Sequence, residues 1–310
     1  MSGSQFQGRI VSLLPSATEM VFALGLEDRL VAVTHECDFP AAARKLPVLV
    51  KPALALEGLS QADIDTAVSA RLHEGGSLYE IDETMLIDLA PDLILAQNLC
   101  QVCAPSGHEL SRALTRLPKE PQVLWMSPRN LAGVRANLED LAAATTCLAQ
   151  GESLLADWEL RLQAVAERAA RIKSRPRVFC MEWLDPVYCP GHWIPEMVRL
   201  AGGEAVLGRE GAESVRIDWG DVCAQRPEIL ILMPCGYTLA QGREIVGSLA
   251  QYSGWSDLPA VRDGQVWLVD ANAYFARPGP RLIEGIELLS HLFAGGPFAG
   301  PADACERLAL

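Results

Sequence analysis

The chain has 310 residues, half of them hydrophobic, and a formal net charge of -13 with a pI near 4.9. This length allows two cores of ordinary domain size. The acidic balance opposes a nucleic-acid surface, and no uncharged apolar run approaches the roughly 18 residues that a membrane-spanning helix requires, so membrane insertion is not expected.

The N-terminal stretch and the cysteines bear on the compartment. Residues 1–20 show no basic region followed by a long apolar segment, which is the pattern of an export signal. Nine cysteines scattered along a long chain fit reduced thiols better than a disulfide framework. We therefore expect a cytoplasmic protein as the sequence stands, and a periplasmic or extracytoplasmic one if a signal has been removed.

The first predicted strand is RIVSLL (9–14), and the helix that follows it has Ser16 or Thr18 as a candidate cap and Gly25 as a candidate end. The predicted strands LVAV (30–33), DLILA (92–96) and QVLWM (122–126) follow. Each of them is a short buried run typical of a parallel sheet. These elements predict an N-terminal α/β lobe over residues 8–150.

Residues 151–174 carry apolar side chains at a helical period with no internal proline or glycine. We expect one long helix here, about 35 Å in length at 1.5 Å per residue. Such a helix would brace two lobes instead of letting them hinge freely.

The second half of the chain repeats the order of the first. RVFCME (177–182), QRPEILIL (225–232) and QVWLV (265–269) are the counterparts of the N-terminal strands, and Glu19-Met20-Val21 matches Glu196-Met197-Val198. The sequence therefore predicts α/β class with two Rossmann-like lobes, the second over residues 175–294.

Unusual residues collect after the predicted strands, where α/β proteins bind ligands. The aromatic residues among them suit a broad, partly apolar ligand in a cleft between the lobes. The candidate ligand-binding residues are Ser16, His35, Glu36, Asp38, Asn98, Glu182, Trp183, Asp185, His192, Trp193, Trp219, Tyr237, Asn272, Tyr274, Phe275 and Arg277.

Several motifs together resemble one known family. SLLPSATEMVFALGL, HECDFP, SLYEIDETMLIDLAPDLILAQNLCQVC, MEWLDP, GHWIPEMVRLAGG and NAYFARPGPRL are similar to motifs of periplasmic binding proteins whose two lobes are joined by one long helix, and within them of the cobalamin-binding branch. The resemblance covers about residues 8–294. It implies non-enzymatic binding of a corrinoid, such as cobalamin or a related metal chelate, for an ABC importer permease or as a soluble carrier, with no catalytic cofactor.

An alternative is a metal-cluster or redox protein that uses the cysteines near the strand ends. Cys100 and Cys103 form a Cys-x-x-Cys pair, and Cys37 and Cys235 follow predicted strands. Residues 34–40, THECDFP, place three metal-binding side chain types together, but adjacent residues on an extended chain point to opposite sides. We expect this stretch to be a wall of the ligand site, with Cys37 packed as a small hydrophobic residue.

Overall fold

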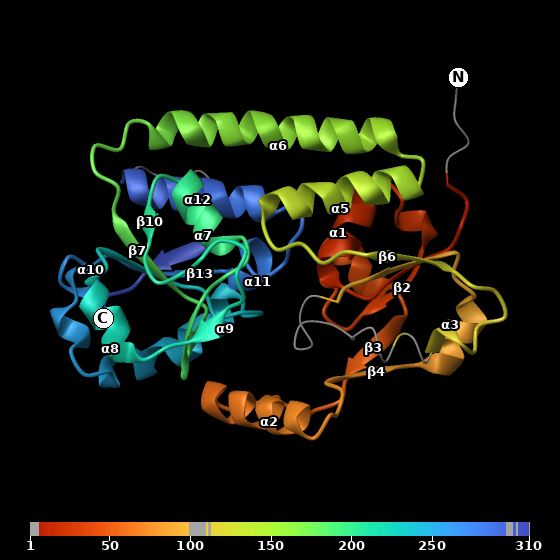
Figure 1. Ribbon diagram of the computed structural model, residues 1–310, viewed down its shortest axis with the longest axis horizontal. Coiled ribbons are helices and arrows are strands. Elements are labelled where there is room, and N and C mark those ends of the chain that lie inside the picture. Colours follow the sequence, from red (N-terminus) through yellow and green to blue (C-terminus); the bar gives the residue numbers. More distant parts are fainter. Residues whose placement is uncertain (1–5, 99–109, 111–112, 296–299, 302, 310) are drawn as a thin grey trace. The chain divides into compact units, whose positions relative to one another are not determined.

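The computed structural model describes residues 6–98, 110, 113–295, 300–301 and 303–309. The chain divides into two compact units (Figure 1). Unit 1 contains Met1–Pro128 and Ala132–Ala156, and unit 2 contains Arg129–Leu131 and Asp157–Leu310. Each unit is built around its own sheet of mainly parallel strands.

Unit 1 has a six-stranded sheet in the order β4-β3-β2-β1-β5-β6, in which only β4 runs antiparallel to its neighbour. The strands are β1 (Ile10–Ser12), β2 (Leu30–Thr34), β3 (Val48–Pro52), β4 (Tyr79–Ile81), β5 (Leu93–Ala96) and β6 (Gln122–Trp125). The α-helices near them in sequence are α1 (Pro15–Ala23), α2 (Gln61–His73), α3 (Glu83–Leu89) and α5 (Leu131–Ala144), with 3-10 helices η1 (Glu27–Arg29) and η2 (Ala41–Lys45).

Unit 2 has a five-stranded sheet, β10-β7-β12-β13-β14, and a small three-stranded sheet, β11-β9-β8. The strands are β7 (Arg177–Met181), β8 (Trp183–Leu184), β9 (Val187–Cys189), β10 (Glu204–Ala205), β11 (Val215–Arg216), β12 (Ile229–Leu232), β13 (Val266–Val269) and β14 (Cys305–Arg307). The helices are α7 (Ile194–Leu200), α8 (Trp219–Gln225), α9 (Leu239–Ile245), α10 (Pro259–Arg262), α11 (Ala271–Tyr274) and α12 (Leu282–Ala294), with η3 (Val246–Gln251) and η4 (Trp255–Asp257).

The repeated motifs of the sequence form corresponding strands. In unit 1, β1, β5 and β6 are parallel neighbours, and β2 follows on the other side of β1. In unit 2, β7, β12 and β13 are parallel neighbours, and β10 follows on the other side of β7. The predicted repeat between the two halves of the chain is therefore confirmed, because four strands have the same order in both sheets.

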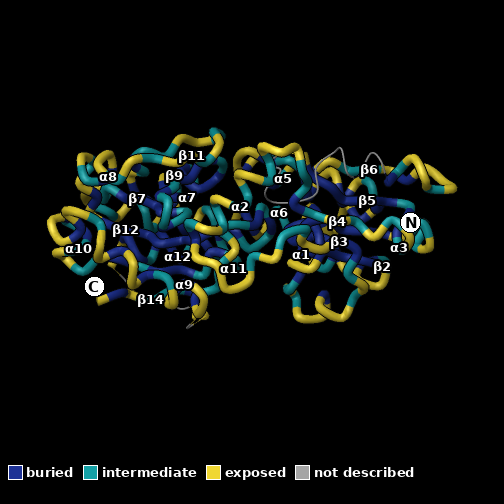
Figure 2. The backbone as a smooth tube through the Cα atoms, turned by 90° about the horizontal axis from the view of Figure 1, so that it is seen from below, coloured by how far each residue is buried: buried dark blue, intermediate teal, exposed yellow. Residues whose placement is uncertain are grey.

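The central strands lie in the interior of each unit. All four residues of β5 and of β12 are buried, and Figure 2 shows the central strands in dark blue with many connecting loops in teal or yellow. A parallel strand covered on both faces needs apolar side chains at every position, which explains the continuous runs LILA and ILIL. Burying each of these leucine or isoleucine side chains stabilises its unit by about 1.5–3 kcal/mol.

The start of α1 differs from the prediction. Pro15 is at the first turn and Leu14 is the N-cap, without a side-chain cap. Pro15 is suited to this position because its φ is already helical and its missing N–H has no partner there. Ser16 and Thr18 therefore lie inside the helix instead of capping it, whereas Gly25, with φ of 73°, follows the helix end as predicted.

The long predicted helix is α6 (Leu148–Ala169), which has 22 residues. It starts three residues before the predicted residue 151 and ends before residue 174. After Ala169 the chain forms only backbone bonds from residues 170, 171 and 172 to the carbonyls of residues 166, 168 and 169, and it then reaches Pro176, which disfavours a helix before it. The division between the units falls inside this helix, after Ala156. The predicted role as a brace stays a prediction.

The predicted end of the second lobe at residue 294 needs correction. β14 (Cys305–Arg307) pairs antiparallel with β13, with Val269 opposite Cys305, so the unit continues beyond α12. A segment of three residues that includes Glu306 and Arg307 is too short and too polar to give a strand pattern.

Among the described residues, no helix has both the length and the apolar character needed to span a membrane.

Candidate functional site

In unit 1, the residues after β2 form a tight turn. The Cys37 N–H donates to the Thr34 carbonyl at 3.1 Å, and the Glu36 N–H donates to Thr34 Oγ1 at 3.1 Å. His35 and Glu36 are exposed, whereas Cys37 is only 4% exposed. The turn therefore presents His35 and Glu36 to the outside and directs Cys37 into the core.

His35 is held by the neighbouring strand β3. Its backbone N–H donates to the Val50 carbonyl at 3.1 Å, and its Nδ1 lies 3.2 Å from the same oxygen. A carbonyl oxygen only accepts, so a neutral imidazole in this contact carries its proton on Nδ1 and keeps the lone pair on Nε2. His35 is thus oriented to offer an acceptor, or a metal-binding nitrogen, on an exposed side chain.

Cys37 is in a chain of buried hydroxyl groups. The Thr18 hydroxyl donates to Ser12 Oγ at 2.9 Å, and the Ser12 hydroxyl donates to the Leu14 carbonyl at 2.9 Å. Cys37 Sγ lies 3.1 Å from Thr18 Oγ1, and because the Thr18 proton is already used, the thiol is the donor. The sequence prediction of a buried Cys37 is confirmed, but the thiol also makes polar contacts that the prediction did not include.

The other unit 1 candidates follow the same edge of the sheet. Asp38 is half-buried, and its carbonyl accepts from Arg44 Nε at 3.2 Å. Asn98 is exposed after β5, and its backbone N–H donates to Ser127 Oγ at 2.8 Å. Ser127, which follows β6, was not predicted, although its place after a strand was a usable signal.

In unit 2, three strand ends meet, and we call residues 182–185, 233–238 and 270–277 the unit 2 rim. They follow β7, β12 and β13. The Cys235 N–H donates to the Glu182 carbonyl at 2.9 Å, and the Asn272 N–H donates to the Tyr237 carbonyl at 3.0 Å. These backbone bonds connect the three segments into one continuous edge.

An aromatic pair stands on this rim. The rings of Trp183 and Tyr237 are 5.7 Å apart between centroids and nearly perpendicular, at 80°. Both side chains are half-buried, and Asp185 and Glu182 on the same hairpin are half-buried as well. An edge-to-face pair fixes both rings while leaving apolar surface available, which suits contact with a flat ligand.

The hairpin that carries Trp183 is held in place by Tyr252. β8 and β9 pair antiparallel, with Trp183 opposite Tyr188. The Tyr252 hydroxyl donates to the Leu184 carbonyl at 2.7 Å, and burial raises the pKa of Tyr252, which keeps it a neutral donor. Sequence reasoning missed Tyr188 and Tyr252, and only the alternation around Asp185-Pro186 could have indicated Tyr188.

Trp219 is part of the support for this hairpin. Its ring lies 4.7 Å from Tyr252 and 5.8 Å from Trp255, and its indole N–H donates to the Ser253 carbonyl at 2.8 Å. The half-buried ring thus packs against the unit 2 core. These contacts hold Trp219 in a stack of three aromatic rings.

Four predicted residues are buried in the structure. Ser16 is 2% exposed, Trp193 6%, Phe275 2% and Arg277 9%. Trp193 donates from its indole N–H to the Phe275 carbonyl at 2.8 Å. These four side chains are packed against other protein groups in this structure. The surface at the strand ends is therefore formed by the other candidates. Ligand contact by these four residues stays a prediction.

Two further candidates lie outside the aromatic pair. His192 has a left-handed backbone, with φ of 50°, and burial lowers the pKa of its imidazole. Tyr274 lines a cavity between α6 and α12, and Arg281 lies 5.9 Å from its ring. Within the unit 2 rim, Trp183 and Tyr237 contact each other, whereas Tyr274 lines this cavity.

The described cysteines of the metal alternative belong to different units. Cys37 is in unit 1 and Cys235 is in unit 2, while Cys100 and Cys103 lie outside the described residues. Within the described part of the chain, no group of three or more histidine, cysteine or acidic residues is placed to hold a metal ion. Burial also raises the pKa of Cys189 to about 12, and that of Cys180 further, so these thiols stay protonated.

Comparison with known proteins identifies relatives over most of the chain. A vitamin B12-binding protein of Vibrio vulnificus is 25% identical over 289 residues, which cover 92% of this chain and 90% of the relative. The crystal structure of the periplasmic vitamin B12 binding protein of Vibrio cholerae matches with a TM-score of 0.66 and 22% identity, over 93% of this chain and 98% of that one. A periplasmic heme binding protein of Pseudomonas aeruginosa matches with a TM-score of 0.72 and 20% identity, over 96% of both chains.

At these identities the two solved structures establish the fold. The family described as periplasmic binding protein matches residues 10–273, which is most of the chain and includes the strand ends of both sheets. The protein therefore belongs to the periplasmic binding protein family, whose members bind ligands and are not enzymes.

Proposed function

We propose that this protein binds a corrinoid, such as cobalamin, as the substrate-binding component of an ABC-type uptake system. The observation that carries the proposal is the match of 24–26% identity to vitamin B12-binding proteins from several species over about nine tenths of the chain. The chemistry of the strand ends supports it, because Trp183 and Tyr237 offer ring faces and Asp185 and Asn272 offer hydrogen-bonding groups at the same rim.

His35 has a separate role in the proposal. Its contact with Val50 leaves Nε2 as the free nitrogen of a neutral ring, which can accept from an amide of the ligand's edge or coordinate a metal centre. The exposed Glu36 and the half-buried Asp38 would accept hydrogen bonds at the same place. Ligand contact by the residues after β2 and by the unit 2 rim together remains part of the proposal.

The test is a titration of the purified protein with cyanocobalamin, followed by calorimetry and by the visible bands of the corrin. We expect saturable binding, and we expect the double variant Trp183→Ala/Tyr237→Ala to weaken it by at least tenfold, since each ring contact contributes on the order of 1 kcal/mol. Leu160→Ala is the control, because this side chain is 65% exposed on α6. Unchanged affinity in the double variant would show that the unit 2 rim is not the corrinoid site.

Haem and the metal alternative are outcomes of the same experiment. Saturable haem binding without corrinoid binding would identify haem as the ligand, which is the ligand named for the Pseudomonas aeruginosa protein. Elemental analysis of protein purified without added ligand decides the other case. Near-stoichiometric zinc or iron that is lost in both His35→Ala and Cys37→Ser would support a metal site, whereas weaker corrinoid binding in His35→Ala alone would support the ligand wall.

The cell compartment of the protein depends on whether it is an uptake component or a soluble corrinoid carrier. An uptake component works outside the cytoplasmic membrane, and the solved Vibrio cholerae and Pseudomonas aeruginosa relatives are described as periplasmic. A soluble corrinoid carrier would work in the cytoplasm. Fractionation of the source cells, with the protein detected by antibody, separates the two roles.

A further inference from the structure

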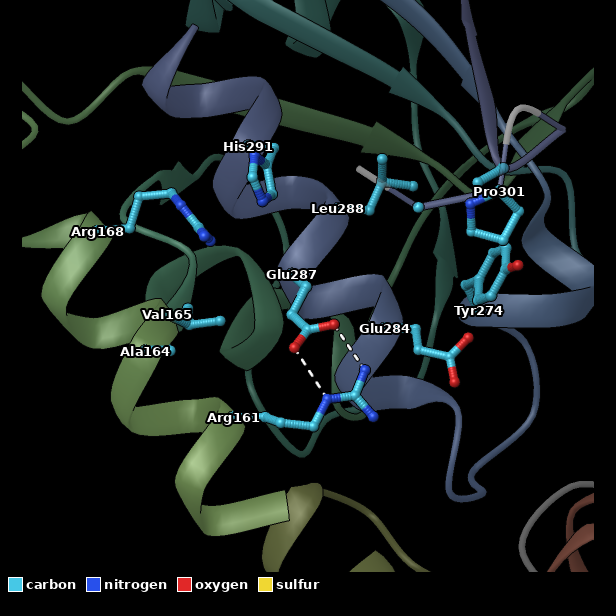
Figure 3. Close-up of a pocket in the computed structure, with 12 residues that line it drawn as sticks. Arg161, Ala164, Val165, Arg168, Tyr274, Glu284, Glu287, Leu288, His291 and Pro301 are labelled. Carbon is cyan, nitrogen blue, oxygen red and sulfur yellow. Dashed lines mark hydrogen bonds and ion pairs between the residues drawn. The ribbon is translucent and has the colours of Figure 1, made fainter. Parts of the chain in front are cut away.

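Unit 2 contains a cavity of about 370 Å³ that shares only Tyr274 with the candidate corrinoid contacts. Helix α6 provides one wall with Arg161 and Arg168, and helix α12 provides the facing wall with Glu284, Glu287 and His291. Tyr274 of α11 closes one end beside Pro301 (Figure 3). The volume is at the small end of the range in which proteins bind small molecules, about 300–1,000 Å³.

Two of the charged groups that line the cavity, Arg161 and Glu287, are paired with each other. Arg161 donates to both oxygens of Glu287, from Nε at 2.9 Å and from the terminal nitrogen at 2.6 Å. This bidentate contact raises the pKa of Arg161 and fixes the guanidinium in the wall. Arg161 is therefore part of the frame of the cavity and has little capacity left for a ligand.

Arg168, two turns further along α6, is different. Its terminal nitrogen donates to Ser290 Oγ at 3.3 Å, and among the described residues no carboxylate forms an ion pair with it. Ser290 is fully buried, and the arginine side chain is half-buried. A positive charge that is partly removed from water and not matched by a carboxylate favours an external anion.

The groups around Arg168 suit the rest of a small ligand. Arg168 and His291 lie on facing helices toward one end of the cavity, whereas Tyr274 lies at the other end (Figure 3). Val165 and Leu288 give apolar wall between them, and burial raises the pKa of Tyr274, so its hydroxyl stays a neutral donor. The ends of the cavity thus differ in charge, with the cationic end at Arg168.

We propose that this cavity is a second binding site, for a small molecule that carries a carboxylate or phosphate group, with Arg168 as the residue that binds the anion. The site is formed by side chains of α6, α11 and α12 together with Gly300, Pro301 and Ala304, and of the candidate corrinoid contacts it includes only Tyr274. It is independent of the ligand bound at the strand ends.

The test is calorimetric titration of the full chain at neutral pH with citrate and, separately, with inorganic phosphate. We expect one of the two probes to bind saturably at millimolar concentration or below, and Arg168→Gln to weaken it by about tenfold or more, because a charge-assisted contact is lost. Arg168→Lys keeps the charge and should retain part of the affinity. The matched control is Arg171→Gln, which removes the same charge from an exposed arginine outside α6.

Binding of citrate without phosphate assigns the site to carboxylates, and the reverse result assigns it to phosphates. The proposal is overturned if neither probe binds saturably, or if Arg168→Gln and Arg171→Gln weaken binding equally, which would reflect net charge alone. Glutamine keeps a polar side chain at this half-buried position, so the fold should persist, and circular dichroism of each variant checks this. Corrinoid affinity should be the same in all three variants, which keeps the outcome separate from the corrinoid proposal.

Discussion

His192 has a backbone conformation that is unfavourable for its residue type. Its φ is 50°, and the conformation is held by two backbone bonds, from its N–H to the Ala212 carbonyl at 2.6 Å and from the Gly211 N–H to its own carbonyl at 2.9 Å. The left-handed region costs a residue with a Cβ about 1–2 kcal/mol. Its Nε2 is buried and has no hydrogen-bond partner within the described part of the chain.

This environment predicts acid sensitivity. Burial lowers the pKa of His192 from 6.5, so the unfolded chain binds a proton more readily than the folded protein does. The contribution of His192 to stability is therefore present above pH 6.5 and is lost as the pH falls from there through the lowered pKa. We expect the urea midpoint of the unchanged protein to decrease on acidification. The midpoint of His192→Asn should decrease less, because asparagine does not titrate. Asparagine also tolerates the left-handed region, so the backbone conformation should be kept.

The measurement compares the urea midpoints at neutral and mildly acidic pH for the unchanged protein and for His192→Asn. If His192→Asn lost as much stability on acidification as the unchanged protein, titration of His192 would not be the cause.

At the scale of elements, the contact between α11 and α12 depends on one glycine. A Cβ on Gly285 would overlap the Tyr274 carbonyl oxygen and would lie 2.9 Å from Met197 Cε and 3.2 Å from the Phe275 ring. Carbonyl oxygens of the backbone cannot move aside as a flexible side chain does. Gly285 therefore allows α12 to approach the short helix that carries Asn272 and Tyr274.

We expect Gly285→Ala to destabilise the protein by about 1–3 kcal/mol, as other overpacked core positions do. Gly220 in α8 is the matched control, because a Cβ there would meet nothing within 4 Å. Gly220→Ala should be neutral or stabilising by up to about 1 kcal/mol. Equal denaturation midpoints for the two variants would contradict the close approach of α11 and α12.

The long parallel strands could be predicted because they are buried on both faces. LILA, ILIL and RVFCM are apolar runs of a kind that loops do not show, and all three are strands. The short strands β8, β9, β10, β11 and β14 have two or three residues each, which is fewer than a pattern needs. Their pairing depends on contacts distant in sequence, such as Trp267 opposite Arg307.

The candidate site was predictable to the extent that strand ends mark it. The rule brought Trp183, Tyr237 and Asn272 to one rim, and the structure connects them by ring contact and backbone hydrogen bonds. Burial was not predictable, because the exposure of Trp193 or Phe275 depends on the neighbours that tertiary packing supplies. The same limit applies to Tyr252, which is far in sequence from the hairpin that it holds.

At the scale of the whole molecule, α6 belongs to both units. Residues 148–156 count with unit 1 and residues 157–169 with unit 2. Ala156→Pro would remove a hydrogen bond in the helix interior and clash with the preceding turn, at a cost of about 3 kcal/mol or more. Because both units include part of this helix, we expect amide exchange to increase in β1 and β5 as well as in β7 and β12.

Leu148→Pro is the control for this helix. Leu148 is the first residue of α6 and is 57% exposed, and proline is tolerated at a first helical position. Its exchange pattern should match that of the unchanged protein. Faster exchange in one unit alone for Ala156→Pro would contradict a structural role of α6 in both.

The position of the unit boundary also sets an order of events during synthesis. The last residue of unit 1 is Ala156, and α6 continues for a further 169 − 156 = 13 residues. At about 5–20 residues per second, the ribosome needs about 1–3 s to make them. During this time α6 is only partly made, and a helical segment of nine residues is marginal alone. The strands of unit 1, which end by Trp125, are therefore all synthesised before α6 is complete, and we expect this sheet to begin pairing without the finished helix.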